Sequence, residues 1–238
     1  MGRCAWNVRC RSVTVDKIIK KIRLLVAVLV VGVVFAVAGL CVTGQRFVID
    51  GDTIGKVVRM YGEQARDRLL EWQDLINRDK SGSDREKLDK VNAFFNRMAF
   101  VSDSDHWGKE DYWATPIEFI ASQGGDCEDF SLAKYFTLKA IGVPENKLNL
   151  TYVKALRLNQ HHMVLTYYSE PGAEPLVLDN LTDRMLPASQ RTDLLPIYSF
   201  NGTALWLAKQ RGRGQMVGSS SRLQRWQDLL QRMPAGMQ

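Results

Sequence analysis

Cysteine is scarce in this sequence, and most of it lies near the start of the chain. Of the four cysteines among 238 residues, Cys4, Cys10 and Cys41 precede residue 42, and Cys127 alone follows. A disulfide within the part of the chain after residue 41 is therefore excluded. A lone thiol in an oxidising compartment is a liability unless it is buried or used chemically, so we expect one of these roles for Cys127.

Excess positive charge is absent from most of the chain. The net charge of +6 and the isoelectric point of about 9.2 would by themselves suggest a nucleic-acid partner. Residues 1–23, however, hold seven basic residues against one acidic residue, which accounts for the whole excess. Residues 24–208 carry a net charge of −5, and the chain from Lys209 onward is basic again. We therefore expect no nucleic-acid partner.

An apolar segment follows the basic start. Residues 24–42 contain no charged or strongly polar side chain, and as a helix they would span about 28 Å, close to the hydrocarbon thickness of a bilayer. We expect residues 1–23 to be a cytoplasmic flank and residues 24–42 to be a transmembrane anchor or a signal peptide. The sequence Ala36-Val-Ala38 resembles a cleavage site, so both alternatives stay open. The rest of the chain is then exported.

The exported part changes from helical to strand-like periodicity. Residues 43–208 are expected to form one α+β domain, with helices first and an antiparallel sheet after them. Residues 100–114 are non-periodic and read as a loop, and residues 209–238 read as a flexible basic tail with a short helix near 223–230. The predicted helices cover residues 54–77, 84–98, 115–122 and 126–141, and the predicted strands cover 148–156, 163–168, 175–178 and 194–200.

Cys127 lies at the first turn of a predicted helix, directly after two glycines. Backbone N–H groups at a helix N-terminus favour a thiolate, as in many reactive cysteines. Three carboxylates, those of Asp126, Glu128 and Asp129, oppose this by raising the pKa of the thiol. Either the cysteine is not a nucleophile, or a histidinium or a bound cation offsets these charges.

Two further residues could complete a catalytic group. His162 opens an alternating strand, whereas its neighbour His161 points to the opposite face. Asp179 follows the next apolar strand, where its carboxylate could hold the Nδ1–H of the imidazole. Cysteine, histidine and aspartate in this order are typical of papain-like and transglutaminase-like enzymes. The alternative is a buried cysteine with an unrelated surface histidine.

Several short segments together resemble the bacterial transglutaminase-like cysteine proteinases of the LapG type, from about Phe95 to Leu207. The resemblance implies a papain/transglutaminase-like core, with the nucleophile at a helix N-terminus packed on the antiparallel sheet. It places the nucleophile at Cys127, the general base at His162 and the orienting aspartate at Asp179. The segments are 111–116, 125–130, 133–138, 151–155, 162–165, 178–181 and 198–201.

The same resemblance implies a calcium site beside the nucleophile. The family's ligands fall on Asp126 and Glu128, and Asp129 is added because it lies close by. Calcium prefers hard oxygen ligands, and its charge would offset the repulsion around the thiol. For Asp126 and Asp129, simple helix capping is the alternative role.

Members of this family are periplasmic proteases, so the resemblance implies the same location, with attachment to the inner membrane if the apolar segment is retained. They cut the N-terminal region of large surface adhesins at a dialanine site, which disperses the biofilm. The periplasmic domain of an inner-membrane cyclic-di-GMP receptor sequesters them. Two alternatives remain: a transglutaminase or amidase with the same three residues, and a non-catalytic interaction module attached to the membrane.

Overall fold

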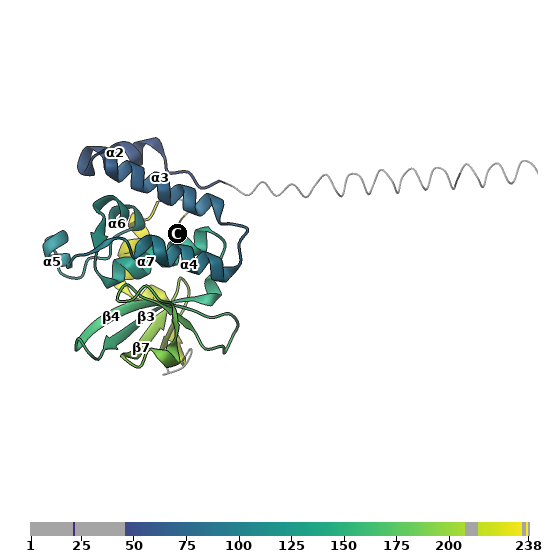
Figure 1. Ribbon diagram of the computed structural model, residues 1–238. Coiled ribbons are helices and arrows are strands. Elements are labelled where there is room, and N and C mark those ends of the chain that lie inside the picture. Colours follow the sequence, from purple (N-terminus) through teal and green to yellow (C-terminus); the bar gives the residue numbers. More distant parts are fainter. Residues whose placement is uncertain (1–20, 22–45, 208–213, 235–236, 238) are drawn as a thin grey trace, which may run out of the picture. The chain divides into compact units, whose positions relative to one another are not determined.

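The helices come first in the chain and an antiparallel sheet follows, as the change in periodicity predicts (Figure 1). The structure is a computed structural model that describes residues 21, 46–207, 214–234 and 237. The predicted flank and apolar segment lie outside the described residues, apart from Lys21. No helix in the described part has the length and apolar character needed to cross a membrane.

The first helical prediction, over residues 54–77, corresponds to two helices. They are α2 (Gly51–Tyr61) and α3 (Glu63–Arg78), and they are separated by Gly62, whose φ of 81° interrupts the helix. The next helices have clear start signals. Ser83 begins α4 (Asp84–Phe95) and Thr115 begins α6 (Pro116–Ser122), each in a capping box with a glutamate three residues later.

Helix α7 (Cys127–Ala140) is the central element of the domain. It is buried along nearly its whole length, with α4 and α6 packed against it on one side and β3 and β4 on the other (Figure 1). Its buried residues are therefore spread around the helix instead of along one stripe, and they include the polar Asp129, Ser131, Lys134 and Thr137. The N-terminus of α7, which bears Cys127, is consequently held by both layers.

Seven strands form the main sheet, in the order β6-β5-β4-β3-β7-β8-β9, and every neighbouring pair is antiparallel. The four predicted strands correspond to β3, β4, β5 and β7. Short elements add a parallel pair, β1 with β2, and one turn of helix, α5. The bounds are β1 Ala99–Phe100, α5 Asp103–His106, β2 Gly124–Gly125, β3 Leu148–Ala155, β4 Gln160–Tyr167, β5 Leu176–Leu178, β6 Leu186–Pro187, β7 Leu194–Phe200, β8 Leu205–Leu207 and β9 Met216–Gly218.

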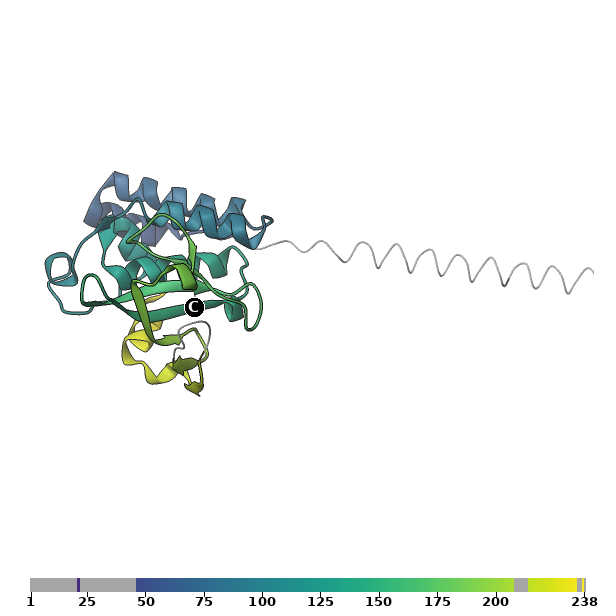
Figure 2. The same cartoon turned by 60° about the horizontal axis from the view of Figure 1, so that its bottom comes forward.

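The C-terminal segment belongs to the domain, which forms one unit over residues 46–238. The predicted helix near 223–230 is present as α8 (Gln224–Arg232), and β9 joins the edge of the sheet (Figure 2). Trp226 of α8 is 1% exposed and stacks on Phe136, with ring centroids 5.5 Å apart. The prediction of a flexible tail is therefore wrong for residues 214–234, because a buried tryptophan fixes this segment to the core.

Candidate active site

Cys127 is the first residue of α7, and the carboxylate of Asp126 caps the helix by accepting a hydrogen bond from the Glu128 N–H at 3.2 Å. The two preceding glycines form β2, which pairs with β1. A Cβ on Gly125 would lie 2.2 Å from Oδ2 of Asp129. Glycine is thus required here because the Asp129 carboxylate approaches the backbone directly in front of the nucleophile candidate.

His162 and Asp179 form a buried pair. Nε2 of His162 lies 2.7 Å from Oδ1 of Asp179, and the Leu181 N–H donates to the same oxygen at 3.1 Å. Burial raises the pKa of Asp179, but the bonds from His162 and Leu181 and the positive charge of Arg191 outweigh it and lower the pKa to about 2. Asp179 is therefore a carboxylate at neutral pH.

The histidine nitrogen that meets the aspartate differs from the one predicted. We expected Asp179 to hold Nδ1, but the structure pairs it with Nε2. Because Nε2 is occupied, Nδ1 is the nitrogen left to exchange a proton with another group.

The ring of His161 stacks on Tyr152 with centroids 5.4 Å apart. We expected alternation to point His161 away from α7, but Tyr152 packs against the core cluster that contains Cys127, whereas His162 lies opposite Val153, which belongs to the cluster on the other face of the sheet. That expectation is wrong, and the bond to Asp179 is what distinguishes His162 from His161.

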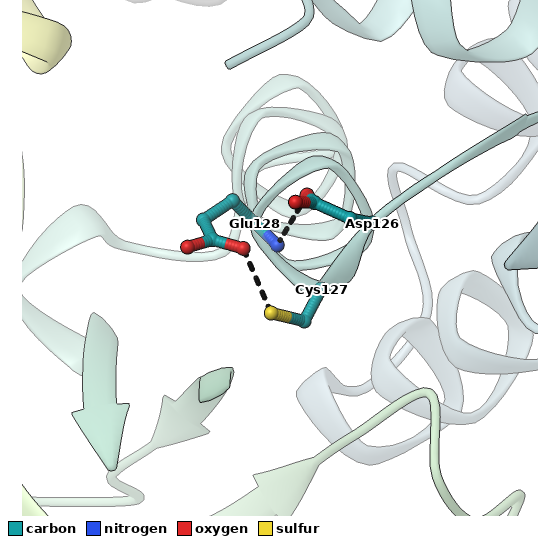
Figure 3. Close-up of side chains that lie close together, drawn as sticks. All are labelled: Asp126, Cys127 and Glu128. Atoms are coloured by element: carbon teal, nitrogen blue, oxygen red, sulfur yellow. Dashed lines mark hydrogen bonds between the residues drawn. The ribbon is translucent and has the colours of Figure 1, made fainter. Parts of the chain in front are cut away.

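The start of α7 contacts β4 next to His162. The hydroxyl of Ser131 donates to the Met163 carbonyl at 2.9 Å, and the Met163 N–H lies against the Cys127 sulfur. The thiol itself donates to Oε2 of Glu128 at 2.7 Å (Figure 3). The structure thus brings Cys127 beside the residue that follows His162, with the thiol hydrogen on Glu128 and not on the imidazole.

Burial raises the pKa of the Cys127 thiol well above its usual value. The charges of Glu128 and Asp126 and the hydrogen bond to Glu128 raise this pKa further, and only the Met163 N–H opposes them. The sulfur is consequently a neutral thiol in this arrangement. A positive charge near the carboxylates would be needed to make it nucleophilic.

Three carboxylates that are buried or half-buried lie close together near Cys127. Ligand oxygens of Asp103, Asp126 and Asp129 all lie within 4.8 Å of one another. Oδ1 of Asp129 accepts from the Ala114 N–H at 2.7 Å, and Oδ2 of Asp103 accepts from the Tyr112 N–H. The second oxygens, Oδ1 of Asp103 and Oδ2 of Asp129, are buried and find no hydrogen-bond partner among the described residues. Buried carboxylate oxygens without partners are rare and indicate a missing ligand.

The electrostatics of this acidic cluster (Asp103, Asp126 and Asp129) agree with a cation site. Burial and the neighbouring carboxylates raise the pKa of Asp103 to about 6 and that of Asp126 to about 9, and they raise that of Asp129 well above its usual value. Hard oxygen ligands of this kind fit Ca²⁺. A divalent cation would satisfy the two free oxygens and offset the repulsion.

The structure also bears on the predicted roles of Asp129 and Glu128. Asp129 does not close a capping box, because its carboxylate accepts from Ala114 across the loop. Glu128 directs its carboxylate to the sulfur of Cys127, and it can form a second group of potential ligands with Asp126 and that sulfur. Its role as a calcium ligand therefore stays a prediction, whereas Asp126 is shared by both groups.

A buried lysine ties α7 and α4 to the loop that carries Asp179. Nζ of Lys134 donates to Oδ1 of Asn92 at 2.9 Å and to Oδ1 of Asn96 at 2.6 Å. The amide of Asn96 in turn donates to the Asp179 carbonyl at 3.0 Å. Burial lowers the pKa of Lys134 to about 7, although the charges of Asp179 and Asp183 oppose this.

This shift predicts a pH-dependent stability. Between pH 7 and 10 the unfolded chain keeps the Lys134 proton and the folded chain loses it, so the free energy of unfolding gains about 1 kcal/mol per pH unit from this group. In Lys134→Met that gain disappears. Urea unfolding at pH 6, 7.5 and 9 checks this, with the exposed Lys90→Met as the control. A constant difference between wild type and Lys134→Met at all three pH values would contradict it.

Sequence reasoning missed two residues of the site. Asp103 lies in the segment expected to be loop, where the acidic run Asp103-Ser-Asp105 after a strand was the available signal. Arg191 donates to Oδ2 of Asp179 at 2.6 Å, and nothing in the local pattern marks it.

A cysteine at the start of a buried helix, next to a strand whose histidine is paired with an aspartate, defines the class of protein: a cysteine protease with a transglutaminase-like fold. Residues 71–206 match the bacterial transglutaminase-like cysteine proteinases. The chain belongs to this family, which confirms the resemblance seen in the sequence.

Solved structures of LapG from Legionella pneumophila are similar to this chain. The match to an EGTA-treated form has 44% sequence identity and a TM-score of 0.68, and covers 80% of this chain and 99% of that chain. The match to a calcium-bound form has 45% identity and a TM-score of 0.66, and covers 77% of this chain and 99% of that chain. No curated protein matches the chain.

Proposed function

We propose that this protease is a calcium-dependent periplasmic endopeptidase that cuts the N-terminal region of a large surface adhesin at a dialanine site. Cleavage would release the adhesin and disperse a biofilm. The observation that carries the proposal is the His162–Asp179 pair beside the helix of Cys127, in a chain that is 44% identical to LapG.

The proposed catalytic cycle assigns one role to each of three side chains. Nδ1 of His162 takes the thiol proton as the sulfur of Cys127 attacks the peptide carbonyl, and then gives it to the leaving amine. Water hydrolyses the resulting thioester with His162 as the base. Asp179 holds Nε2–H, which fixes the tautomer, and the Cys127 N–H at the helix terminus is positioned to donate to the oxyanion.

The acidic cluster is the part of the site that would hold calcium. Asp103, Asp126 and Asp129 would supply oxygens, with Glu128 as a further candidate. When bound, the ion supplies positive charge that favours ionisation of the neighbouring thiol. For Cys127 to react, its hydrogen must leave Glu128, so Glu128 is the residue whose position separates the inactive from the active arrangement.

The location and the regulator are part of the same proposal. The basic flank and the apolar run over residues 24–42 support export to the periplasm, with attachment to the inner membrane if the run is not cleaved. The periplasmic domain of an inner-membrane cyclic-di-GMP receptor is the inhibitor that family membership suggests. Binding would block access of the adhesin to Cys127 when the nucleotide is abundant.

The test is incubation of the full chain with the N-terminal fragment of a co-encoded large adhesin, in calcium and mild detergent. We expect one new N-terminus between two alanines, identified by mass spectrometry, and no cut in a matched fragment whose dialanine is replaced by two bulky charged residues. A glutamine–lysine crosslink without a new N-terminus would instead indicate a transglutaminase. Binding without any covalent change would indicate an interaction module.

A further inference from the structure

One of the two carboxylate oxygens of Asp179 accepts its hydrogen bond from a buried arginine, Arg191. Oδ1 accepts from His162 and from the Leu181 N–H, whereas among the described residues Oδ2 accepts from Nη2 of Arg191 alone, at 2.6 Å. Asp179 and Arg191 are both buried. Without the guanidinium, one oxygen of a buried charge would lose its partner, and the carboxylate could turn about its Cβ–Cγ bond.

The arginine is itself held in one plane. Its Nε and Nη2 form a two-pronged ion pair with Asp193, at 3.0 and 2.9 Å. Nη2 therefore spends one hydrogen on Asp193 and the other on Asp179. The backbone around it is anchored as well, since the Arg191 N–H donates to the Ala188 carbonyl and the Leu156 N–H donates to the Asp193 carbonyl.

Hydrogen bonds thus connect the turn before β7 to the imidazole of His162, and each one fixes the orientation of the next side chain. Asp193 sets the plane of the guanidinium, the guanidinium sets the Asp179 carboxylate, and the carboxylate sets the ring of His162. Arginine suits the central position because its donors lie in a rigid plane, which an ammonium group lacks.

We propose that Arg191 is a positioning residue for the protease, held by Asp193, that orients the Asp179 carboxylate and through it the imidazole of His162. The proposal rests on the proposed role of these residues in catalysis. It assigns a task to two residues that act through Asp179. Their loss should slow the chemical step and leave substrate binding nearly unchanged.

The test compares Arg191→Gln, Arg191→Lys and Asp193→Asn with wild type in calcium. Arg85→Gln is the matched control, because Arg85 pairs with a carboxylate on an exposed helix face. For Arg191→Gln we expect kcat to fall about 100-fold with KM within about threefold, and for Arg191→Lys and Asp193→Asn about 10-fold. The low-field proton signal of Nε2–H should shift or broaden, and alkylation of Cys127 by iodoacetamide should slow.

Each result supports or contradicts the positioning role of Arg191. Unchanged kcat in a folded Arg191→Gln, or a lost rate with an unchanged low-field proton, would overturn the proposal. If Arg191→Gln does not fold, Arg191→Lys and Asp193→Asn decide by the same signals. Asp179→Asn separates the two proposals. If this variant is fully active, the catalytic role of Asp179 is refuted. If it is inactive while Arg191→Gln is fully active, only the positioning role of Arg191 is refuted.

Discussion

Replacement of Cys127 by alanine will abolish peptide-bond cleavage while the protein stays folded. Loss of the nucleophile in a proteolytic triad lowers kcat by about 10⁴-fold or more. The side chain is small and lies at a helix terminus, so the free energy of unfolding should change by no more than about 1 kcal/mol. Cleavage of the adhesin fragment, circular dichroism and thermal unfolding measure the two effects separately.

The matched controls for this prediction are Cys41→Ala and Cys127→Ser. Cys41→Ala removes a thiol that lies within the predicted targeting segment, and it should keep full activity. Cys127→Ser keeps a similar shape but replaces the thiol by a much weaker acid, so it should be as inactive as the alanine variant. Undiminished cleavage by Cys127→Ala would show that another residue is the nucleophile. An unchanged biological effect without cleavage would favour the interaction module.

Chelation is expected to have the second-largest effect. EGTA should abolish cleavage and excess Ca²⁺ should restore it, because two buried carboxylate oxygens of the acidic cluster have no protein partner. Calcium should also raise the midpoint of thermal unfolding by several degrees, since an ion that binds only the folded state stabilises it. Mg²⁺ should substitute poorly because it requires tighter octahedral coordination.

Asp103→Asn distinguishes the acidic cluster from other sites. The substitution removes one ligand charge, so calcium should bind at least about 10-fold more weakly. In EGTA the same variant should be more stable than wild type, because it relieves repulsion among buried carboxylates. The exposed Asp105→Asn is the control, and it should change neither property. Full activity of metal-free wild type would refute the calcium dependence.

The sequence was sufficient where local signals agree with the tertiary structure. The glycine pair and Asp126 predicted the start of α7, and the alternating pattern predicted β3, β4, β5 and β7 with small errors at their ends. The positions of His162 and Asp179 on neighbouring strands predicted their pairing. These features depend on periodicity and capping, which act over a few residues.

The rest depends on contacts between distant segments. The break at Gly62 is one such case, because the amphipathic pattern continues across it and only the φ of 81° separates the helices. Asp103 enters the acidic cluster from a loop without periodicity, and Arg191 reaches Asp179 from a turn 12 residues later. The polar composition after Lys209 concealed Trp226, whose partners Phe136 and Phe200 lie far away in the chain.

The position of Trp226 has a consequence for biosynthesis. Its indole packs against Phe136 of α7, so the helix that bears the nucleophile lacks part of its packing until the segment with Trp226 has been synthesised. Contacts that span so much of the chain form late and slowly. A chain that stops before Trp226 would thus lack part of the support for the helix that bears Cys127.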